Sequence, residues 1–193
     1  MKKFFLSILV LISCLLFSQK NIEKEVSIKK MYQINFAGFP RTAELIELTN
    51  GEYKGHFKII LDRENENTTQ EIQREVAINK TNVKEVMLIL ETMGIETITD
   101  CQKNNDCKEF PDADFTSFKI KTEKTEREYS FTNLSNQDIK NEKPENRRQA
   151  QQILNFIEKR LNFKIEFQKI KDKLPSGSYS YFSGNSIYSF EIK

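Results

Sequence analysis

The sequence predicts an α+β fold, in which an antiparallel β-sheet of about six to eight strands carries two or three α-helices on one face. Three observations predict it. Apolar and polar residues alternate over much of residues 31–78 and again near the C-terminal end. Two other segments repeat their apolar residues at helical spacing. Strand-like segments follow one another in pairs joined by short turn signals, which is typical of hairpins and a meander.

The N-terminal part of the domain is predicted to be a four-stranded meander. Asn50-Gly51 joins two of its strands and is a strong hairpin signal, because both residues tolerate the positive φ of a type I′ turn. The elements expected in order are a strand at Met31–Phe36, a turn at Gly38-Phe39-Pro40, strands at Thr42–Thr49 and Glu52–Leu61, a charged tip at Asp62–Thr69, and a strand ending at Ile78.

The first helix is predicted from Val83, Val86, Met87, Leu90 and Met93, which lie on one helical face. Asn82 and Glu85 have the spacing of a capping box, and Gly94 is suited to a helix C-terminus. The elements expected after it are a hairpin of Phe115–Thr122 and Thr125–Thr132, a helix opened by Pro144 and running to Leu161, and a closing hairpin of Tyr179–Phe182 and Ile187–Ile192. Residues 163–174 fit either a helix or, in part, a strand.

The chain is predicted to be exported. Residues 1–18 have the character of a cleavable signal peptide, with Lys2 and Lys3 before the apolar run Phe4–Phe17. That run is shorter than the roughly 20 apolar residues of a membrane-spanning helix, so no transmembrane helix is expected in the mature chain. Residues 19–29 are predicted to be a flexible lead, and residues 30–193 a single α+β domain. The expected location is periplasmic or extracellular.

The position of cleavage has two interpretations. Ser18 is a small residue that permits cleavage before Gln19 and gives a soluble domain. Leu11-Ile12-Ser13-Cys14 instead has the form of a lipobox, in which Cys14 is lipidated and tethers the domain to a membrane. Cleavage at Ser18 is favoured, because the apolar residues that follow Cys14 are unusual after a lipid attachment site.

Charge and cysteine content limit the function classes. The signal segment carries two lysines and no acid, so the mature chain has 28 basic and 28 acidic side chains, and no nucleic-acid partner is expected. Cys101 and Cys107 are predicted to form a disulfide in an oxidising compartment. Neither cysteine has a second Cys or His pair nearby in the sequence to complete a metal site.

Several segments resemble small exported proteins of flavobacteria. The similarity lies in Gly38-Phe39-Pro40, Asn50-Gly51-Glu52-Tyr53, Ser117–Lys121 with Arg127–Phe131, and Leu174–Tyr179. These motifs are structural, and the resemblance extends over most of the mature chain. The resemblance implies export, and it implies no catalytic chemistry, cofactor or metal.

No catalytic or cofactor motif is found in the sequence. His56 is the only histidine and is predicted to be an exposed strand residue opposite Phe57 and Ile59, so neither a catalytic triad nor a metal centre is expected. The acidic residues between Asp100 and Asp114 lack calcium-loop spacing and predict a solvated loop. The basic segment 145–173 predicts a solvated helix face rather than a membrane-docking surface. No cofactor is expected.

The most suggestive candidate surface is the aromatic C-terminal hairpin, with Tyr179, Tyr181, Phe182 and Tyr188 set among serines and glycines. Packing of these aromatic side chains on the sheet is the alternative interpretation. Phe39 and Arg41, in and after the Gly38 turn, form a second candidate loop. The sequence thus favours a non-enzymatic exported domain that binds a protein or envelope component. The alternatives are a small carboxylate-based hydrolase acting on cell-wall or glycan substrates, and a structural envelope lipoprotein anchored at Cys14.

Overall fold

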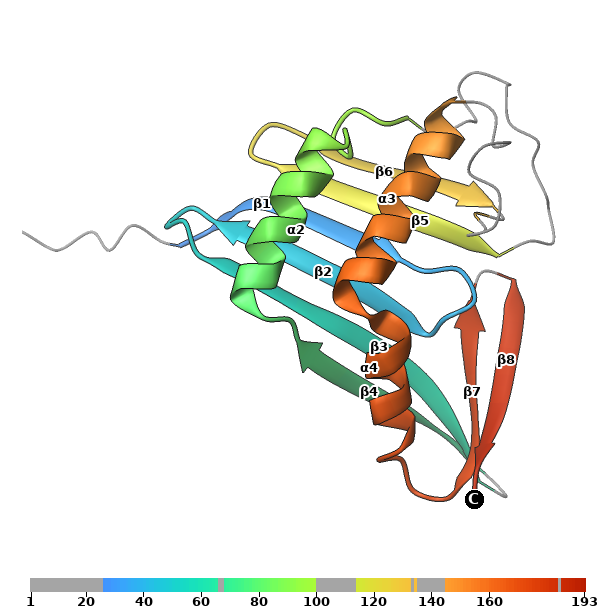
Figure 1. The fold of residues 1–193 in the computed structure, drawn as a ribbon. Coiled ribbons are helices and arrows are strands. Elements are labelled where there is room, and N and C mark those ends of the chain that lie inside the picture. The colour runs from blue at the N-terminus through green and yellow to red at the C-terminus, as the bar shows by residue number, and fades with distance from the viewer. Residues whose placement is uncertain (1–25, 66–67, 100–113, 133, 135–144, 184) are drawn as a thin grey trace, which may run out of the picture.

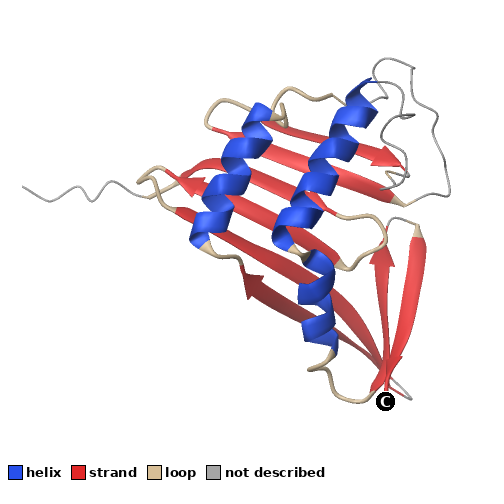
Figure 2. Ribbon diagram, in the orientation of Figure 1, coloured by secondary structure: helices blue, strands red, loops and turns tan. Residues whose placement is uncertain are grey.

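The computed structural model describes residues 26–65, 68–99, 114–132, 134, 145–183 and 185–193. Its eight strands form one antiparallel sheet, and its three helices lie across one face of that sheet, as Figures 1 and 2 show. The α+β fold predicted from the sequence is therefore confirmed. The predicted signal peptide, Cys14, Cys101 and Cys107 all lie outside the described residues.

The elements follow the order predicted from the sequence. They are β1 (Ile28–Asn35), β2 (Arg41–Leu48), β3 (Tyr53–Asn65), β4 (Thr68–Ala77), α2 (Lys80–Thr92), β5 (Phe115–Thr122), β6 (Glu126–Thr132), α3 (Glu145–Leu161), α4 (Phe163–Lys171), β7 (Gly177–Ser183) and β8 (Ser186–Ile192). The hydrogen-bonded order across the sheet is β6-β5-β1-β2-β3-β7-β8, and β4 pairs with β3.

Strand β3 is the organising element of the sheet, because three strands pair with it. Its residues 56–65 pair with β4, its residues 53–59 with β2, and its residues 62–64 with β7. Since β4 occupies one edge of β3 from residue 56 to residue 65, β2 and β7 share the other edge and meet end to end near Ile60. The amide of Ile60 donates to the carbonyl of Pro40 at 3.1 Å, just before β2 begins.

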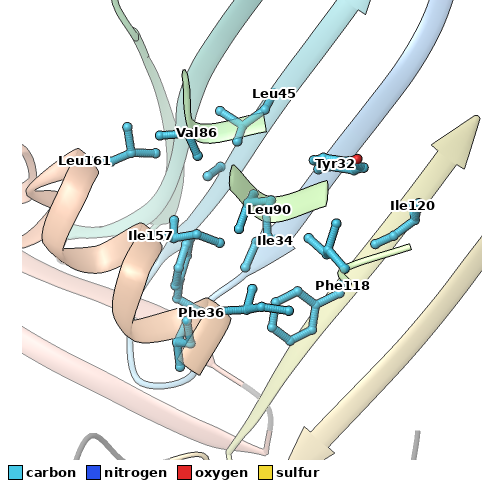
Figure 3. Close-up of a cluster of buried hydrophobic side chains, with 14 of the residues drawn as sticks. Tyr32, Ile34, Phe36, Leu45, Val86, Leu90, Phe118, Ile120, Ile157 and Leu161 are labelled. Atoms are coloured by element: carbon cyan, nitrogen blue, oxygen red, sulfur yellow. The ribbon is translucent and has the colours of Figure 1, made fainter. Parts of the chain in front are cut away.

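The main core lies between the sheet and helices α2 and α3. Alternate residues of the strands point toward the helices, and apolar residues at helical spacing point back (Figure 3). Buried side chains from this layer include Tyr32, Ile34, Leu45, Leu90, Phe118, Ile120 and Ile157. A second, smaller cluster of Ile59, Leu61, Leu174 and Tyr179 lies beneath α4 and the β7–β8 hairpin. The hairpin thus has its own small core beside the main one.

Three local predictions are wrong. The N-cap of α2 is Asn79, whose side-chain oxygen accepts the amide of Thr81 at 2.9 Å, so Asn82 lies inside the helix and forms no capping box. The charged tip expected at residues 62–69 belongs largely to strands β3 and β4, because paired strands can extend beyond the core with polar residues on both faces. Strand β1 also begins at Ile28, inside the predicted flexible lead.

One other local prediction is confirmed, and the alternative left open for residues 163–174 is resolved. Gly94 has φ of 79° just after α2, in the left-handed region that ends helices, and its amide donates to the carbonyl of Glu91. Residues 163–171 are helical, and α4 follows α3 after a break at Asn162.

Candidate functional site

A cleft of about 510 Å³ opens where β2 and β7 meet along β3. Its volume is within the range of about 300–1,000 Å³ that is common for small-molecule sites. Four of the predicted binding residues line it, although they come from distant parts of the chain: Phe39, Arg41, Tyr181 and Phe182. The structure therefore joins the two surfaces that the sequence indicated separately.

Arg41 is the unusual residue of this cleft. It is the first residue of β2, faces the helices, and is only 5% exposed. None of its three guanidinium nitrogens has a hydrogen-bond partner among the described residues. Burial lowers the pKa of Arg41 to about 10, although Glu158 and Tyr181 act through space in the opposite direction. The side chain therefore remains a cation at neutral pH.

Three aromatic rings surround the guanidinium carbon of Arg41. The ring centroids of Phe39, Phe163 and Phe36 lie 4.0, 4.7 and 5.5 Å from it. Cation–π attraction of this kind contributes roughly 0.5–2 kcal/mol per contact, depending on desolvation. The rings hold the cation in place without meeting its need for hydrogen-bond acceptors.

The break between α3 and α4 positions one of these rings. Asn162 has φ of 49°, in the left-handed region, and this turns the chain so that Phe163 points into the core. The Phe163 ring packs edge-to-face against Phe36 and Phe57, with centroid distances of 4.3 and 4.8 Å. Phe163 is thus fixed by the core, whereas Phe39 is only half-buried.

The turn between β1 and β2 is attached to the C-terminal hairpin. Gly38 has φ of 73°, and its amide donates to the Ser183 hydroxyl at 2.7 Å. Its carbonyl accepts a hydrogen bond from the Tyr181 hydroxyl at 3.2 Å. Tyr188 stacks on Tyr181 and donates its hydroxyl hydrogen bond to Asp114. These contacts fix the backbone of the turn while leaving the Phe39 side chain at the cleft wall.

The other predicted hairpin residues have structural roles. Tyr179 is fully buried, stacks on Phe190 and donates to the carbonyl of Pro175 at 2.7 Å. Tyr188 stacks on the Tyr181 ring and does not line the cleft. Burial raises the pKa of Tyr181, and the hydrogen bond to Asp114 raises that of Tyr188. Both phenols therefore remain neutral hydrogen-bond donors at physiological pH.

Two exposed apolar residues of the cleft are absent from the candidates that the sequence indicated. Ile60 and Phe115 line it and are 40% and 41% exposed, and Phe182 is 67% exposed. The signal was present for Ile60, because Ile59 and Leu61 occupy the inward positions and an isoleucine between them must point outward. No signal in the sequence placed Phe115 beside Phe182.

Two acidic residues also line the cleft. Asp62 and Glu71 are direct cross-strand partners on β3 and β4. Directly opposed side chains have Cβ atoms about 4.5–5.5 Å apart. Glu71 is exposed to solvent. The pair is therefore close enough to act together but lies in a solvated part of the cleft.

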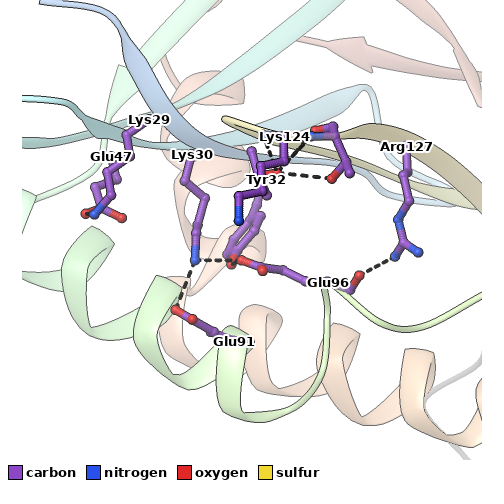
Figure 4. A network of polar contacts seen from close by, with 10 residues as sticks. Lys29, Lys30, Tyr32, Glu47, Glu91, Glu96, Lys124 and Arg127 are labelled. Carbon is purple, nitrogen blue, oxygen red and sulfur yellow. Dashed lines mark hydrogen bonds and ion pairs between the residues drawn. The ribbon is translucent and has the colours of Figure 1, made fainter.

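A second polar cluster joins the segment after α2 to the sheet, as Figure 4 shows. The Glu96 carboxylate accepts hydrogen bonds from the Tyr32 hydroxyl and the Lys30 ammonium, at 2.5 and 2.6 Å, and Lys30 also pairs with Glu91 at 3.0 Å. Arg127 donates to the carbonyls of Glu96 and Ile98. Every member of this cluster has a partner, which is typical of a structural network.

The pKa shifts of this second cluster follow from its contacts. Partial burial alone would raise the pKa of Glu96, but hydrogen bonds from Lys30 and Tyr32 outweigh it, and the pKa is lowered. Burial would likewise lower the pKa of Lys30, but hydrogen bonds to Glu96 and Glu91 raise it. The ion pair is therefore formed over the whole neutral range.

The remaining sequence candidates have ordinary surroundings. His56 is partly exposed, and its Nε2 lies 3.7 Å from the Glu44 carboxylate on the outward face. In the basic segment, Arg148, Arg160 and Lys169 form ion pairs with Glu145, Glu85 and Glu166. The acidic loop lies outside the described residues except for Asp114. These contacts give none of these residues a place in the cleft beside Arg41.

Within the described ranges, no group of three or more His, Cys, Asp or Glu side chains is placed to hold a metal ion. No helix in the same part of the chain is both long and apolar enough to cross a membrane. No protein-family model matches the sequence, and no curated protein matches it.

Proposed function

We propose that this protein is an exported binding domain, without enzymatic activity of its own, that holds part of an envelope component or partner protein in the cleft beside Arg41. The observation that carries the proposal is the gathering of three exposed apolar residues, Phe182, Phe115 and Ile60, around one concave site. Exposed apolar groups that surround a cavity mark ligand sites more often than scattered ones do.

Export is part of the proposal and is supported by the N-terminal segment. Lys2, Lys3 and the apolar run up to Phe17 have the features of a signal peptide. The resemblance to exported flavobacterial proteins supports the same location, where Cys101 and Cys107 would form a disulfide. An N-terminal mass measurement on the mature protein tests this. A chain that begins at Gln19 supports a soluble domain, and a lipidated Cys14 supports the alternative of a tethered envelope lipoprotein.

The binding role is tested by comparing two serine variants of the C-terminal hairpin. Phe182 and Ile187 are cross-strand partners on the same face and are 67% and 65% exposed, but only Phe182 lines the cleft. We expect Phe182→Ser to reduce capture of the ligand from envelope fractions about tenfold or more, because burying a phenylalanine contributes roughly 2 kcal/mol. Ile187→Ser is the matched control and should change capture less than twofold. Equal losses of capture in both variants would mean that the hairpin makes only non-specific apolar contacts.

A second candidate function, a small carboxylate-based hydrolase acting on cell-wall or glycan substrates, is favoured by one observation. Asp62 and Glu71 face each other in the cleft at a spacing compatible with the roughly 5 Å between the carboxyl groups of retaining glycosidases. Such an enzyme would lose its activity in both Asp62→Asn and Glu71→Gln. We expect the wild-type chain to release no product from peptidoglycan or glycan substrates. Hydrolysis abolished by either amide variant would replace the binding proposal.

A further inference from the structure

We infer that Arg41 is the recognition point for a carboxylate, and that the cleft takes a small amphiphile with a single carboxylate on an apolar body. This inference rests on the proposed function, because it names the ligand class of the same cleft. Four features of the cleft support it: the buried Arg41 cation without a partner among the described residues, the Phe39 ring that covers it, the exposed apolar residues at the rim, and two acidic residues beyond that rim.

The first feature is the unsatisfied guanidinium. Buried charged groups are normally paired, because leaving one without hydrogen bonds is strongly unfavourable. Arg41 has three buried nitrogens without a partner among the described residues, whereas Arg127 donates to two backbone carbonyls. A planar guanidinium matches the two oxygens of a carboxylate in a bidentate hydrogen bond. A ligand carboxylate would therefore satisfy a guanidinium that the described part of the chain leaves unpaired.

The second feature is the way the guanidinium is covered. Phe36 and Phe163 are almost completely buried and support it from within the core. Phe39 lies closest, at 4.0 Å, is half-buried, and is itself part of the cleft wall. Because hydrogen bonds to Ser183 and Tyr181 hold the turn at Gly38, rotation of the Phe39 side chain alone can uncover the cation. The ligand carboxylate would take the place of this ring.

The third and fourth features define the rest of the ligand. Phe182, Phe115 and Ile60 offer an apolar rim to a hydrocarbon or side-chain body. Beyond them, Asp62 and Glu71 balance the charges of Arg41 and Lys58 in the lining. A second negative charge on the ligand would lie near these two acids, and their repulsion would weaken its binding. The lining thus favours a monoanion with an apolar body over phosphates and other polyanions.

The test uses octanoate as the probe and the full mature chain as the protein. Octanoate should bind saturably in calorimetry and raise the melting temperature of the wild type, because a ligand that binds only the folded state stabilises it. Octan-1-ol and octylamine have the same apolar body without the carboxylate and should bind at least tenfold more weakly. A peptide with apolar C-terminal residues is compared with its C-terminal amide. Preference for the free peptide over octanoate assigns the carboxylate to a protein C-terminus, and the reverse assigns it to a fatty acid.

The variants test the role of Arg41 directly. Arg41→Met should lower octanoate affinity tenfold or more, and Arg41→Lys should keep part of it, because an ammonium offers charge without the planar fork. Phe39→Ala should tighten octanoate binding, because no ring then has to be displaced. Arg63→Met is the matched control. Arg63 also lies over an aromatic ring, that of Tyr179 at 6.0 Å, but it does not line the cleft. This control should bind octanoate like the wild type.

Three results would overturn the inference: no octanoate or peptide carboxylate binds the wild type, octanol binds as tightly as octanoate, or Arg41→Met binds unchanged. If Arg41→Met does not fold, unchanged octanoate affinity in both Arg41→Lys and Phe39→Ala would overturn it equally. Failure here is separable from failure of the proposed function. Envelope capture that depends on Phe182, in a protein that binds no carboxylate, rejects the ligand class and leaves the binding cleft in place.

Discussion

Lys30 and Arg41 lie on neighbouring strands, point toward the same helical layer, and have opposite surroundings. Lys30 is partly buried and makes ion pairs with Glu91 and Glu96, which in turn accepts a hydrogen bond from Tyr32. Arg41 is more deeply buried and lies among aromatic rings without a hydrogen-bond partner among the described residues. One fold therefore contains a completed polar network and an incomplete one.

The difference separates residues that hold the structure from residues that await a ligand. Satisfied buried networks make a fold specific, and removing one member leaves the others unpaired. An unsatisfied buried cation contributes little to stability, and replacing it by an apolar residue is often neutral or favourable. We therefore expect the two regions to respond to mutation in opposite ways.

The largest effect is expected at Phe163, which supports Arg41 and joins the main core. Phe163→Ala should lower the free energy of unfolding by about 3–5 kcal/mol, because it removes a fully buried ring and leaves a cavity. Urea unfolding measures the change. Ile165→Ala, two residues later on an exposed face, is the control and should change stability by less than about 0.5 kcal/mol. A loss below about 1 kcal/mol for Phe163→Ala would show that the aromatic support is unimportant.

The next largest effect is expected in the completed network. Lys30→Met should lower the free energy of unfolding by about 1–3 kcal/mol. Glu96 and Glu91 then lose their shared cation, and Glu96 remains partly buried. Urea unfolding again measures the loss. Lys29→Met is the neighbouring control. Lys29 is exposed to solvent and pairs with the single carboxylate of Glu47, so its loss should lower the free energy of unfolding by less than about 1 kcal/mol. If the two variants lose equal free energy of unfolding, the network around Glu96 stabilises the fold no more than an ordinary surface ion pair does.

The pH dependence of stability should sharpen the same contrast. The pKa of Glu96 is lower in the folded chain than its ordinary value of 4.5, so its contribution is complete above about pH 4.5 and is lost as pH falls through the folded pKa. Glu96→Gln should remove this component, so that wild type and variant converge in stability toward low pH and differ by about 1 kcal/mol at pH 7. Thermal unfolding between pH 2.5 and pH 7 measures it. A constant difference across this range would contradict the assignment.

The smallest change is expected at Arg41 itself. Without ligand, Arg41→Met should leave the free energy of unfolding within about 0.5 kcal/mol of the wild type or raise it slightly, because methionine keeps contact with the rings and removes an unpaired charge. The comparison with Lys30→Met in the same urea experiment is decisive. If the two variants lose similar stability, Arg41 is a structural residue, and the contrast between the regions disappears.

The sequence was informative about local elements and less so about how they meet. Asn50-Gly51 identified the β2–β3 turn, and Gly51 has φ of 82° as that signal requires. The alternation Arg41-Ala43-Leu45 is compatible with an inward Arg41, but a charged residue directly after a Gly-Phe-Pro turn predicts a position in a loop. Gly55 gave no signal of its own, yet a Cβ there would lie 2.6 Å from the Val83 side chain of α2. Such contacts depend on which distant elements pack together.

The cleft could not be predicted for the same reason. Four of its apolar residues, Phe39, Ile60, Phe115 and Phe182, come from four segments of the chain. Local periodicity does not determine that β5 pairs with β1 or that β7 pairs with β3. Tyr179 and Phe182 show the limit clearly. Both are aromatic residues of one short hairpin, but one is buried beneath α4 and the other is exposed, because the neighbouring helix covers only one face.

The attachment of the β1–β2 turn to the C-terminal hairpin also has a consequence for folding. Gly38 and Ser183, which hydrogen-bond at 2.7 Å, are 145 positions apart in the chain. Contacts between such distant residues require a large loop to close and form more slowly than local hairpins such as β2–β3 or β5–β6. A chain with most of its secondary structure in place would still lack the wall formed by Tyr181 and Phe182. The capacity to bind would then be among the last properties that the folding chain acquires.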